Sequence, residues 1–199
     1  MNRRAFLLAS ALALPPAVVL SADAPLAVAD AEAAVSMLMS LDELVVASTH
    51  VVVATASDRY SAWEQLPSGK RIVTYTKLTV ERAIAGAPPQ EIWVRTLGGV
   101  VGKLGQSVAG EAQIATGSRS LFFLAGVGNA VVVTGMAQGH YPIIADDKGV
   151  ARLKPSPDPG MLVPRRGPTI SAQEQLVGGK LDDALALIAA SKKARDEKK

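Results

Sequence analysis

The chain lacks cysteine, and histidine and aromatic residues are scarce in it. Its 199 residues include two histidines, His50 and His140, and only 4% are Phe, Trp or Tyr. Without cysteine there can be no disulfide scaffold, no thiolate metal site and no cysteine nucleophile. Two histidines leave little room for a metal centre built from several imidazole ligands. We therefore expect no metal and no cofactor, and most enzyme classes are disfavoured.

The composition is that of a chain with enough apolar side chains to fold. Hydrophobic residues make up 49% of the sequence and charged residues 20%, with a formal net charge of +3. This amount of apolar side chain excludes a chain that is disordered throughout. At roughly 150 residues per domain, the length predicts one domain with tails.

The first 29 residues resemble an export signal. The basic pair Arg3-Arg4 precedes an apolar stretch at 5–20, and Ala27-Val28-Ala29 offers a cleavage site between small residues. This order of basic, apolar and small residues is typical of secretory signals. A membrane anchor is the alternative, but the stretch contains Pro15-Pro16 and is shorter than the about 20 apolar residues of a spanning helix. We predict a signal peptide over 1–29.

The segment Arg3-Arg4-Ala5-Phe6-Leu7 is similar to the bacterial twin-arginine signal, in which two arginines precede large apolar residues. A general secretory signal with two basic residues is the alternative. The twin-arginine route carries folded proteins, which suits a chain without cysteine. The sequence predicts an exported protein, periplasmic or secreted, with no membrane span after cleavage.

Composition divides the rest of the chain into four segments. They are an Ala-rich lead-in at 30–39, a β-barrel domain with an N-terminal helix at 40–153, a Pro-rich linker at 154–170, and a C-terminal helix with a charged tail at 171–199. The lead-in is expected to be loose or to add a helical turn. Ser40 and Glu43 form the capping-box pattern of a helix start. Because Gly178-Gly179 interrupts the C-terminal helix, we expect two short helices or one loosely held helix.

The central segment has the residue pattern of a β-domain. Short runs of β-branched and apolar residues alternate with Gly and Pro turns; the runs lie at 50–55, 72–80, 91–96, 121–124, 130–134, 141–144 and 150–153. Many short strands with few helices predict a mainly β fold. We expect a small OB-like antiparallel barrel of five to seven strands, flanked by an N-terminal and a C-terminal helix.

The sequence lacks the motifs that would indicate catalysis. The glycines at 98–105 lack the spacing, Lys and hydroxyl residue of a phosphate-binding P-loop. There is no Gly-x-Ser-x-Gly elbow, so a catalytic triad would have to use His50 in a strand or His140 at a turn. His140 is the better candidate, although an ordinary surface histidine is the simpler interpretation. The sequence therefore favours a protein that is not an enzyme.

Two neighbouring strands carry a candidate binding surface. Tyr75, Lys77, Trp93 and Arg95 are predicted to share one outward face of the 72–80 and 91–96 runs. Aromatic residues between cations can stack on ligands and bind anions, as on barrel faces that hold oligosaccharides. The alternative is that the linker or the C-terminal helix covers the aromatic rings.

The order of these elements resembles a known family. The segments Thr79–Gly86 ("TVERAIAG") and Leu121–Leu124 ("LFFL") are similar to strands of exported bacterial domains with the netrin-like, tissue-inhibitor-of-metalloproteinases-like fold. The resemblance covers about residues 41–145 and implies a five-stranded OB-type barrel with flanking helices. The animal inhibitors of that group use an N-terminal cysteine, which this chain lacks, so no functional residue is carried over.

We predict a non-catalytic exported module that binds another protein of the envelope or outside the cell, a protease included. One alternative is a binder of carbohydrate or of an anionic polymer that uses the aromatic and basic face. Another is a hydrolase with a site near His140, and a third is a purely structural envelope protein. Export makes nucleic acid a poor candidate ligand.

Overall fold

The computed structural model describes residues 35–164, 167 and 169–197, so the predicted signal peptide and residues 30–34 lie outside the described residues. The elements follow one another as β1 (Val35–Met37), α1 (Leu41–Ala47), β2 (His50–Leu66), β3 (Gly69–Ala85), β4 (Glu91–Leu97), β5 (Gly99–Val101), β6 (Leu104–Gln106), β7 (Arg119–Val127), β8 (Ala130–Val133), the 3-10 helix η1 (Met136–Gly139), β9 (His140–Ala145), β10 (Ala151–Leu153), β11 (Met161–Val163), α2 (Ala172–Leu176) and α3 (Leu181–Asp196). Within these residues no helix is both long and apolar enough to cross a membrane.

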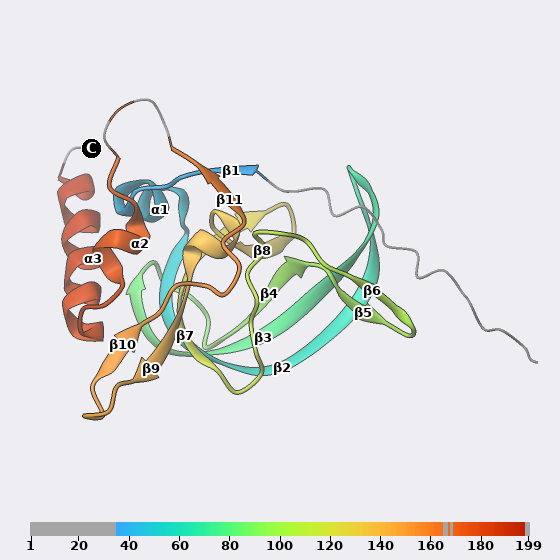
Figure 1. Ribbon diagram of the computed structural model, residues 1–199, viewed down its shortest axis with the longest axis horizontal. Coiled ribbons are helices and arrows are strands. Elements are labelled where there is room, and N and C mark those ends of the chain that lie inside the picture. Colours follow the sequence, from blue (N-terminus) through green and yellow to red (C-terminus); the bar gives the residue numbers. More distant parts are fainter. Residues whose placement is uncertain (1–34, 165–166, 168, 198–199) are drawn as a thin grey trace, which may run out of the picture.

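The predicted mainly β class is confirmed, with 48% strand and 20% helix. One large sheet has the strand order β10-β9-β7-β2-β3-β4-β8, and β8 also pairs with β7. Within this sheet every pairing is antiparallel, as expected, except that of β4 with β8, which is parallel and departs from the prediction. Strands β1 and β11 form a separate parallel pair. Figure 1 shows the helices gathered at one side of the sheet and the tip of the β2–β3 hairpin at the other.

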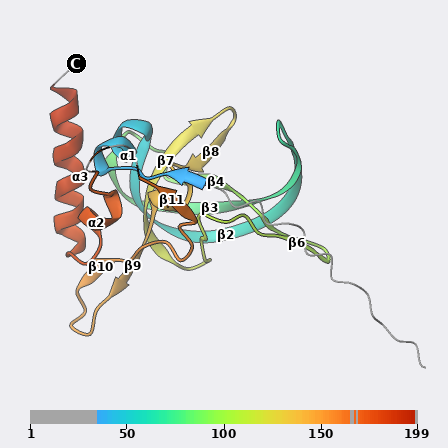
Figure 2. The same cartoon turned by 45° about the horizontal axis from the view of Figure 1, so that its top comes forward.

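The β2–β3 hairpin is longer than the sequence predicts. Both strands have 17 residues, and their pairing runs from Val51↔Ala85 to Leu66↔Gly69. The segment 56–65 shows little hydrophobic alternation because this part of β2 extends beyond the core and is largely exposed. The hairpin therefore has a buried root and a projecting tip, which Figure 2 shows curling away from the helices.

The root of β2 separates two hydrophobic cores. Val51 and Val53 face the helices, whereas Val52, Ala54 and Ala56 face the interior formed by β3, β4 and β7. A strand buried on both faces reads as a continuous apolar run, because neither face needs polar residues. This explains the unbroken apolar sequence that begins at Val51 and marks the strand so clearly.

Capping boxes start helices α1 and α2. In the one predicted at α1, the Glu43 backbone N–H donates to Ser40 Oγ over 3.3 Å and the Ser40 N–H donates to Glu43 Oε2 over 2.8 Å. The same reciprocal pattern starts α2 at Ser171 and Glu174. The C-terminal segment forms two helices, with α2 before Gly178-Gly179 and α3 after it. Their apolar residues are buried in the core that also holds α1: Leu176, Leu181, Leu185 and Ile188.

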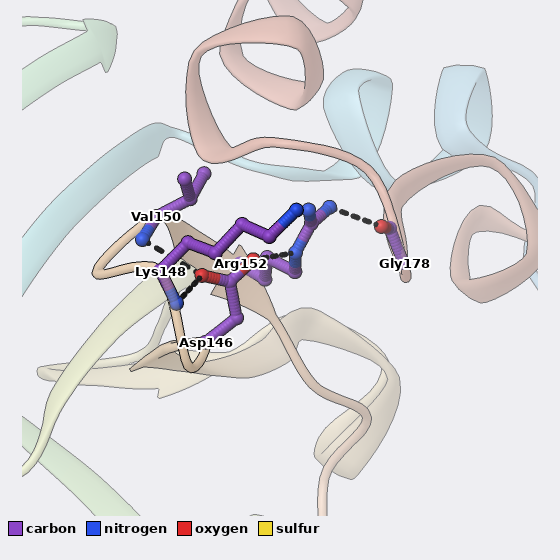
Figure 3. Close-up of polar contacts among 5 residues, drawn as sticks. All are labelled: Asp146, Lys148, Val150, Arg152 and Gly178. Carbon is purple, nitrogen blue, oxygen red and sulfur yellow. Dashed lines mark hydrogen bonds and ion pairs between the residues drawn. The ribbon is translucent and has the colours of Figure 1, made fainter.

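A polar clip joins the β9–β10 hairpin to the connection between α2 and α3 (Figure 3). Asp146 accepts hydrogen bonds from the backbone N–H groups of Lys148 and Val150, both 2.9 Å long, and from Arg152 Nε at 2.7 Å. The Arg152 guanidinium also donates to the Gly178 carbonyl over 2.8 Å. The bond from Arg152, followed by those from the backbone, lowers the pKa of Asp146.

Two segments outside the predicted strands contain short strands. The lead-in holds β1, which pairs with β11 from the Pro-rich linker. The lead-in is thus neither loose nor helical over Val35–Met37, because its backbone finds a partner more than 120 residues away. The Gly-rich stretch after β4 likewise contains the β5–β6 hairpin.

Candidate functional site

The outer face of β3 and β4, meaning the face turned away from the interior core, brings together the four residues that the sequence singled out. Tyr75 lies opposite Arg95 and Lys77 lies opposite Trp93 in the antiparallel register. Directly opposed residues of two strands project to the same side. The predicted alternation is thus correct, and the four side chains share one surface.

Tyr60 of β2 completes an aromatic shelf, which we define as Tyr60, Tyr75 and Trp93. The Tyr60 ring stacks on Tyr75 with centroids 5.3 Å apart and meets Trp93 edge-on at 5.4 Å. Tyr60 is not among the residues expected at this surface, because the apolar run predicts a strand that ends at residue 55. The pairing Tyr60↔Tyr75 follows once the strand is extended to the turn before Gly69.

The aromatic shelf is open to solvent. Tyr60 is 53% exposed and Trp93 is 40% exposed. The C-terminal helix α3, one of the covers considered from the sequence, packs on α1 and on the ends of β3 and β10 instead. Exposed neighbouring aromatic rings on a rigid sheet offer contact area that loses little conformational entropy on binding.

Both cations beside the shelf are engaged in ion pairs. Lys77 Nζ lies 2.8 Å from Glu91 Oε1, and Arg95 Nη1 lies 2.8 Å from Glu64 Oε1. The Tyr75 hydroxyl donates to the second Glu64 oxygen over 3.0 Å. Burial, followed by this contact with Glu64, raises the pKa of Tyr75. The cations are therefore largely neutralised, which weakens the case for an anionic polymer.

An apolar cleft of about 370 Å³ adjoins the shelf at Arg95. It lies between the β2–β3 turn and the β7–β8 hairpin, and its apolar lining comprises Leu66, Pro67, Leu97, Val127, Val132, Val133 and Met136. Arg95 lines the cleft, and its guanidinium donates to the Glu64 carboxylate that also accepts from the Tyr75 hydroxyl. The cleft and the shelf are therefore continuous at Arg95. This cleft could not be found from the sequence, since it requires strands that are distant along the chain.

His140 is buried, so its predicted place at an exposed turn is wrong. It is the first residue of β9, is 1% exposed, and stacks on Phe122 with ring centroids 5.0 Å apart. Its Nε2 lies 3.1 Å from Ser120 Oγ and its Nδ1 lies 3.2 Å from Ser156 Oγ. Burial lowers the pKa of His140 to about 4. The ring is therefore neutral at pH 7 and holds the linker residue Ser156 against the sheet.

This serine–histidine contact gives the hydrolase hypothesis no support. Ser120 is fully buried, so a substrate cannot reach its hydroxyl. The two partners recorded for the imidazole are serines, and a triad would need an acidic group to orient the ring. In the described part of the chain, no group of three or more His, Cys, Asp or Glu side chains is placed to hold a metal ion.

The aromatic shelf with its apolar cleft is thus the candidate binding site on the outer face. Comparisons of the chain with protein-family models, with curated proteins and with solved structures found no match.

Proposed function

We propose that the protein is an exported, non-catalytic module that binds another protein of the envelope or outside the cell. The observation that carries this proposal is the continuity of the exposed aromatic shelf with the apolar cleft at Arg95. The shelf offers flat aromatic contacts, and the cleft can receive an apolar side chain of the partner.

The composition of this surface favours a protein partner. Tyr, Trp and Arg dominate the energetically important positions of protein interfaces, especially beside pockets from which water is excluded. The paired cations also fit this role, because Arg95 and Lys77 already have carboxylate partners and need none from a ligand. The partner surface that fits is therefore apolar rather than strongly acidic.

Carbohydrate binding is the second candidate function. The exposed rings of Tyr60 and Trp93 favour it, since sugar rings stack on aromatic faces. A neutral glycan is preferred over an anionic polymer because the neighbouring cations are paired. This candidate makes no use of the apolar cleft, which is why we place it second.

For the architecture, we propose that β2, β3, β4, β8 and β7 form an OB-type barrel of the netrin-like kind. Support comes from β8, which pairs in parallel with β4 through Val94↔Val131 and antiparallel with β7 through Leu124↔Val133. The circuit of pairings thereby returns to its first strand. In OB-folds the second and third strands carry the ligand face, which corresponds to the outer face of β3 and β4. Interstrand NMR contacts between the Val94 and Val131 backbones are expected; their absence would remove the barrel.

Export is proposed from the N-terminal sequence, and cell fractionation tests it. A tagged full-length chain is expected in the periplasm or the medium of its bacterial host. Replacing Arg3 and Arg4 together by lysine should leave the chain in the cytoplasm if the twin-arginine route carries it. Unchanged export of that variant would indicate the general secretory route, and a wild-type chain found only in the cytoplasm would end the proposal.

The binding function is tested by comparing two tryptophan variants. Immobilised wild-type protein, Trp93→Ala and Trp63→Ala are each exposed to envelope and culture-fluid proteins, and what they retain is identified by mass spectrometry. Trp63 is a matched control, because it is 42% exposed on the opposite face of the same hairpin. We expect one protein retained by the wild type and Trp63→Ala but not by Trp93→Ala. Retention of glycan alone would favour the second candidate, and identical retention by all three would contradict both.

A further inference from the structure

The inner face of the same hairpin lines a second cavity, of about 500 Å³. Thr74, Thr76 and Thr96 form one wall, and the segment 107–115 forms the other. Here the apolar interior stops: Leu78 belongs to the core, whereas the next two inward positions on β3 are threonines. Threonine in place of valine at inward positions indicates a wall that meets polar groups.

The three threonine hydroxyls differ in their hydrogen bonding within the described part of the chain. Thr74 Oγ1 donates to the Gly98 carbonyl over 2.7 Å and lies 2.8 Å from Ser61 Oγ. Thr96 Oγ1 reaches the Thr74 carbonyl at 3.4 Å. Thr76 is 1% exposed, and its Oγ1 has no hydrogen-bond partner among the residues that the structure describes. An unpaired buried hydroxyl costs about 1–3 kcal/mol. Because Thr76 lines the cavity, a bound group that formed a hydrogen bond to this side chain would recover that cost.

Two ionisable groups face this cavity. Arg59 lies directly opposite Thr76 in the pairing of β2 with β3. Its guanidinium Nη1 donates to the Ile114 carbonyl oxygen over 3.5 Å. Among the described residues it has no carboxylate partner. Glu111 is held by the backbone N–H groups of Leu97 and Ala112, at 3.1 and 3.0 Å, and burial raises its pKa.

We propose that this cavity binds a small hydroxylated carboxylic acid, such as a uronic acid. The carboxylate of the ligand forms an ion pair with Arg59. The hydroxyl groups of the ligand form hydrogen bonds with Thr76 and donate to the lone pairs of Glu111 that the backbone N–H groups leave free. The volume is in the range of small-molecule sites, which hold ligands of this size. The cavity shares the lining residues Leu97 and Glu111 with the apolar cleft. Arg59 and Thr76, however, lie on the face of β2–β4 opposite the aromatic shelf, so this inference does not rest on the proposed protein partner.

The test is a titration of the full chain with D-glucuronate, followed by NMR shifts of backbone amides, with D-glucose as the uncharged comparison. Glucuronate should shift amides of Thr76 and of the 107–115 segment and bind at least tenfold more tightly than glucose. Binding that is absent, or equal for the two sugars, overturns the proposal. Shifts confined to the aromatic shelf would overturn it too, while supporting a glycan at the outer face.

Two variants locate the site. Arg59→Gln should weaken glucuronate binding at least tenfold, whereas Lys148→Gln, which removes an exposed charge from the β9–β10 turn, should leave it unchanged. Thr76→Val keeps the side-chain shape; it should weaken binding several-fold while raising the melting temperature, because the unpaired hydroxyl is gone. Thr79→Val, on the outer face of β3, should do neither. Wild-type affinity in both Arg59→Gln and Thr76→Val contradicts the assignment.

Discussion

The two halves of β2 differ in what surrounds them, and the difference separates stability from binding. Its root, at 50–56, lies between two cores and contains five fully buried residues. Its projecting part, at 57–66, contains no fully buried residue yet carries Arg59, Tyr60 and Glu64. One continuous strand thus anchors the fold at one end and presents both candidate sites at the other.

The rigidity of the projecting part comes from its pairing rather than from a core. Every residue from Asp58 to Leu66 has a partner in β3, and β4 continues the sheet from Val73 onwards. A hairpin of this kind holds its side chains in place through backbone hydrogen bonds while leaving them accessible. Substitutions should therefore have opposite consequences in the two halves: loss of stability at the root and loss of binding at the tip.

The largest effect is expected at the root. Phe122 of β7 lies opposite Val52, is fully buried, and stacks on His140. Phe122→Ala leaves a cavity in the interior core and should lower the free energy of unfolding by about 3–5 kcal/mol. Urea unfolding followed by circular dichroism measures this change. A loss below about 1 kcal/mol would show that the root does not dominate stability.

The next effect depends on pH. Because burial lowers the pKa of His140 to about 4 from an ordinary 6.5, the unfolded chain binds a proton between these values that the folded chain does not. The contribution of His140 to the free energy of unfolding is fully present above pH 6.5. It decreases on acidification to pH 4, by about 3 kcal/mol in total. Glu111, whose pKa is raised by burial, acts in the opposite direction and offsets part of the loss.

Comparison with His140→Gln isolates the histidine. Unfolding free energies of both proteins are measured between pH 7 and 4, and the wild type should lose more over this range. The amide of glutamine can still hydrogen-bond to Ser120 or Ser156, so the fold should be retained. Parallel curves for the two proteins would mean that His140 does not titrate as its burial requires.

A smaller effect is expected at the start of α2. Ser171→Ala removes the capping-box hydroxyl that accepts from the Glu174 N–H over 3.1 Å, and should cost about 1 kcal/mol. Since α2 packs in the core shared with the root of β2, the loss should appear in global unfolding. If only local amide exchange near Ser171 quickens, the helices unfold separately from the sheet.

The smallest change in stability is expected at the tip. Trp63→Ala removes an exposed ring that lies 5.4 Å from Lys70 Nζ, a contact worth about 0.5 kcal/mol at an exposed site. Thermal unfolding should therefore be nearly that of the wild type. A loss comparable to that of Phe122→Ala would erase the contrast between root and tip.

The sequence is informative where one rule governs a segment. The capping box at Ser40 depends on two residues three apart, and the facing of Tyr75 and Trp93 depends on simple alternation. Both predictions are confirmed.

The missed features all depend on contacts between distant segments. Tyr60 belongs to a strand that is stabilised by pairing with β3 rather than by its own hydrophobic pattern. His140 is buried because Ser156, from the linker, and Phe122, from β7, enclose it. The 500 Å³ cavity joins β3 and β4 to the segment after β6. Contacts between segments so far apart in the sequence cannot be predicted from a local residue pattern.

The most direct test of the proposed binding surface uses the partner once it has been captured and purified. Its dissociation constant is measured by calorimetric titration with the wild type, Trp93→Ala and Trp63→Ala. Because an aromatic residue at the centre of an interface contributes about 2 kcal/mol or more, Trp93→Ala should weaken binding at least 30-fold, with Trp63→Ala within about twofold of the wild type. Equal affinities for the two variants would contradict a binding site on the aromatic shelf.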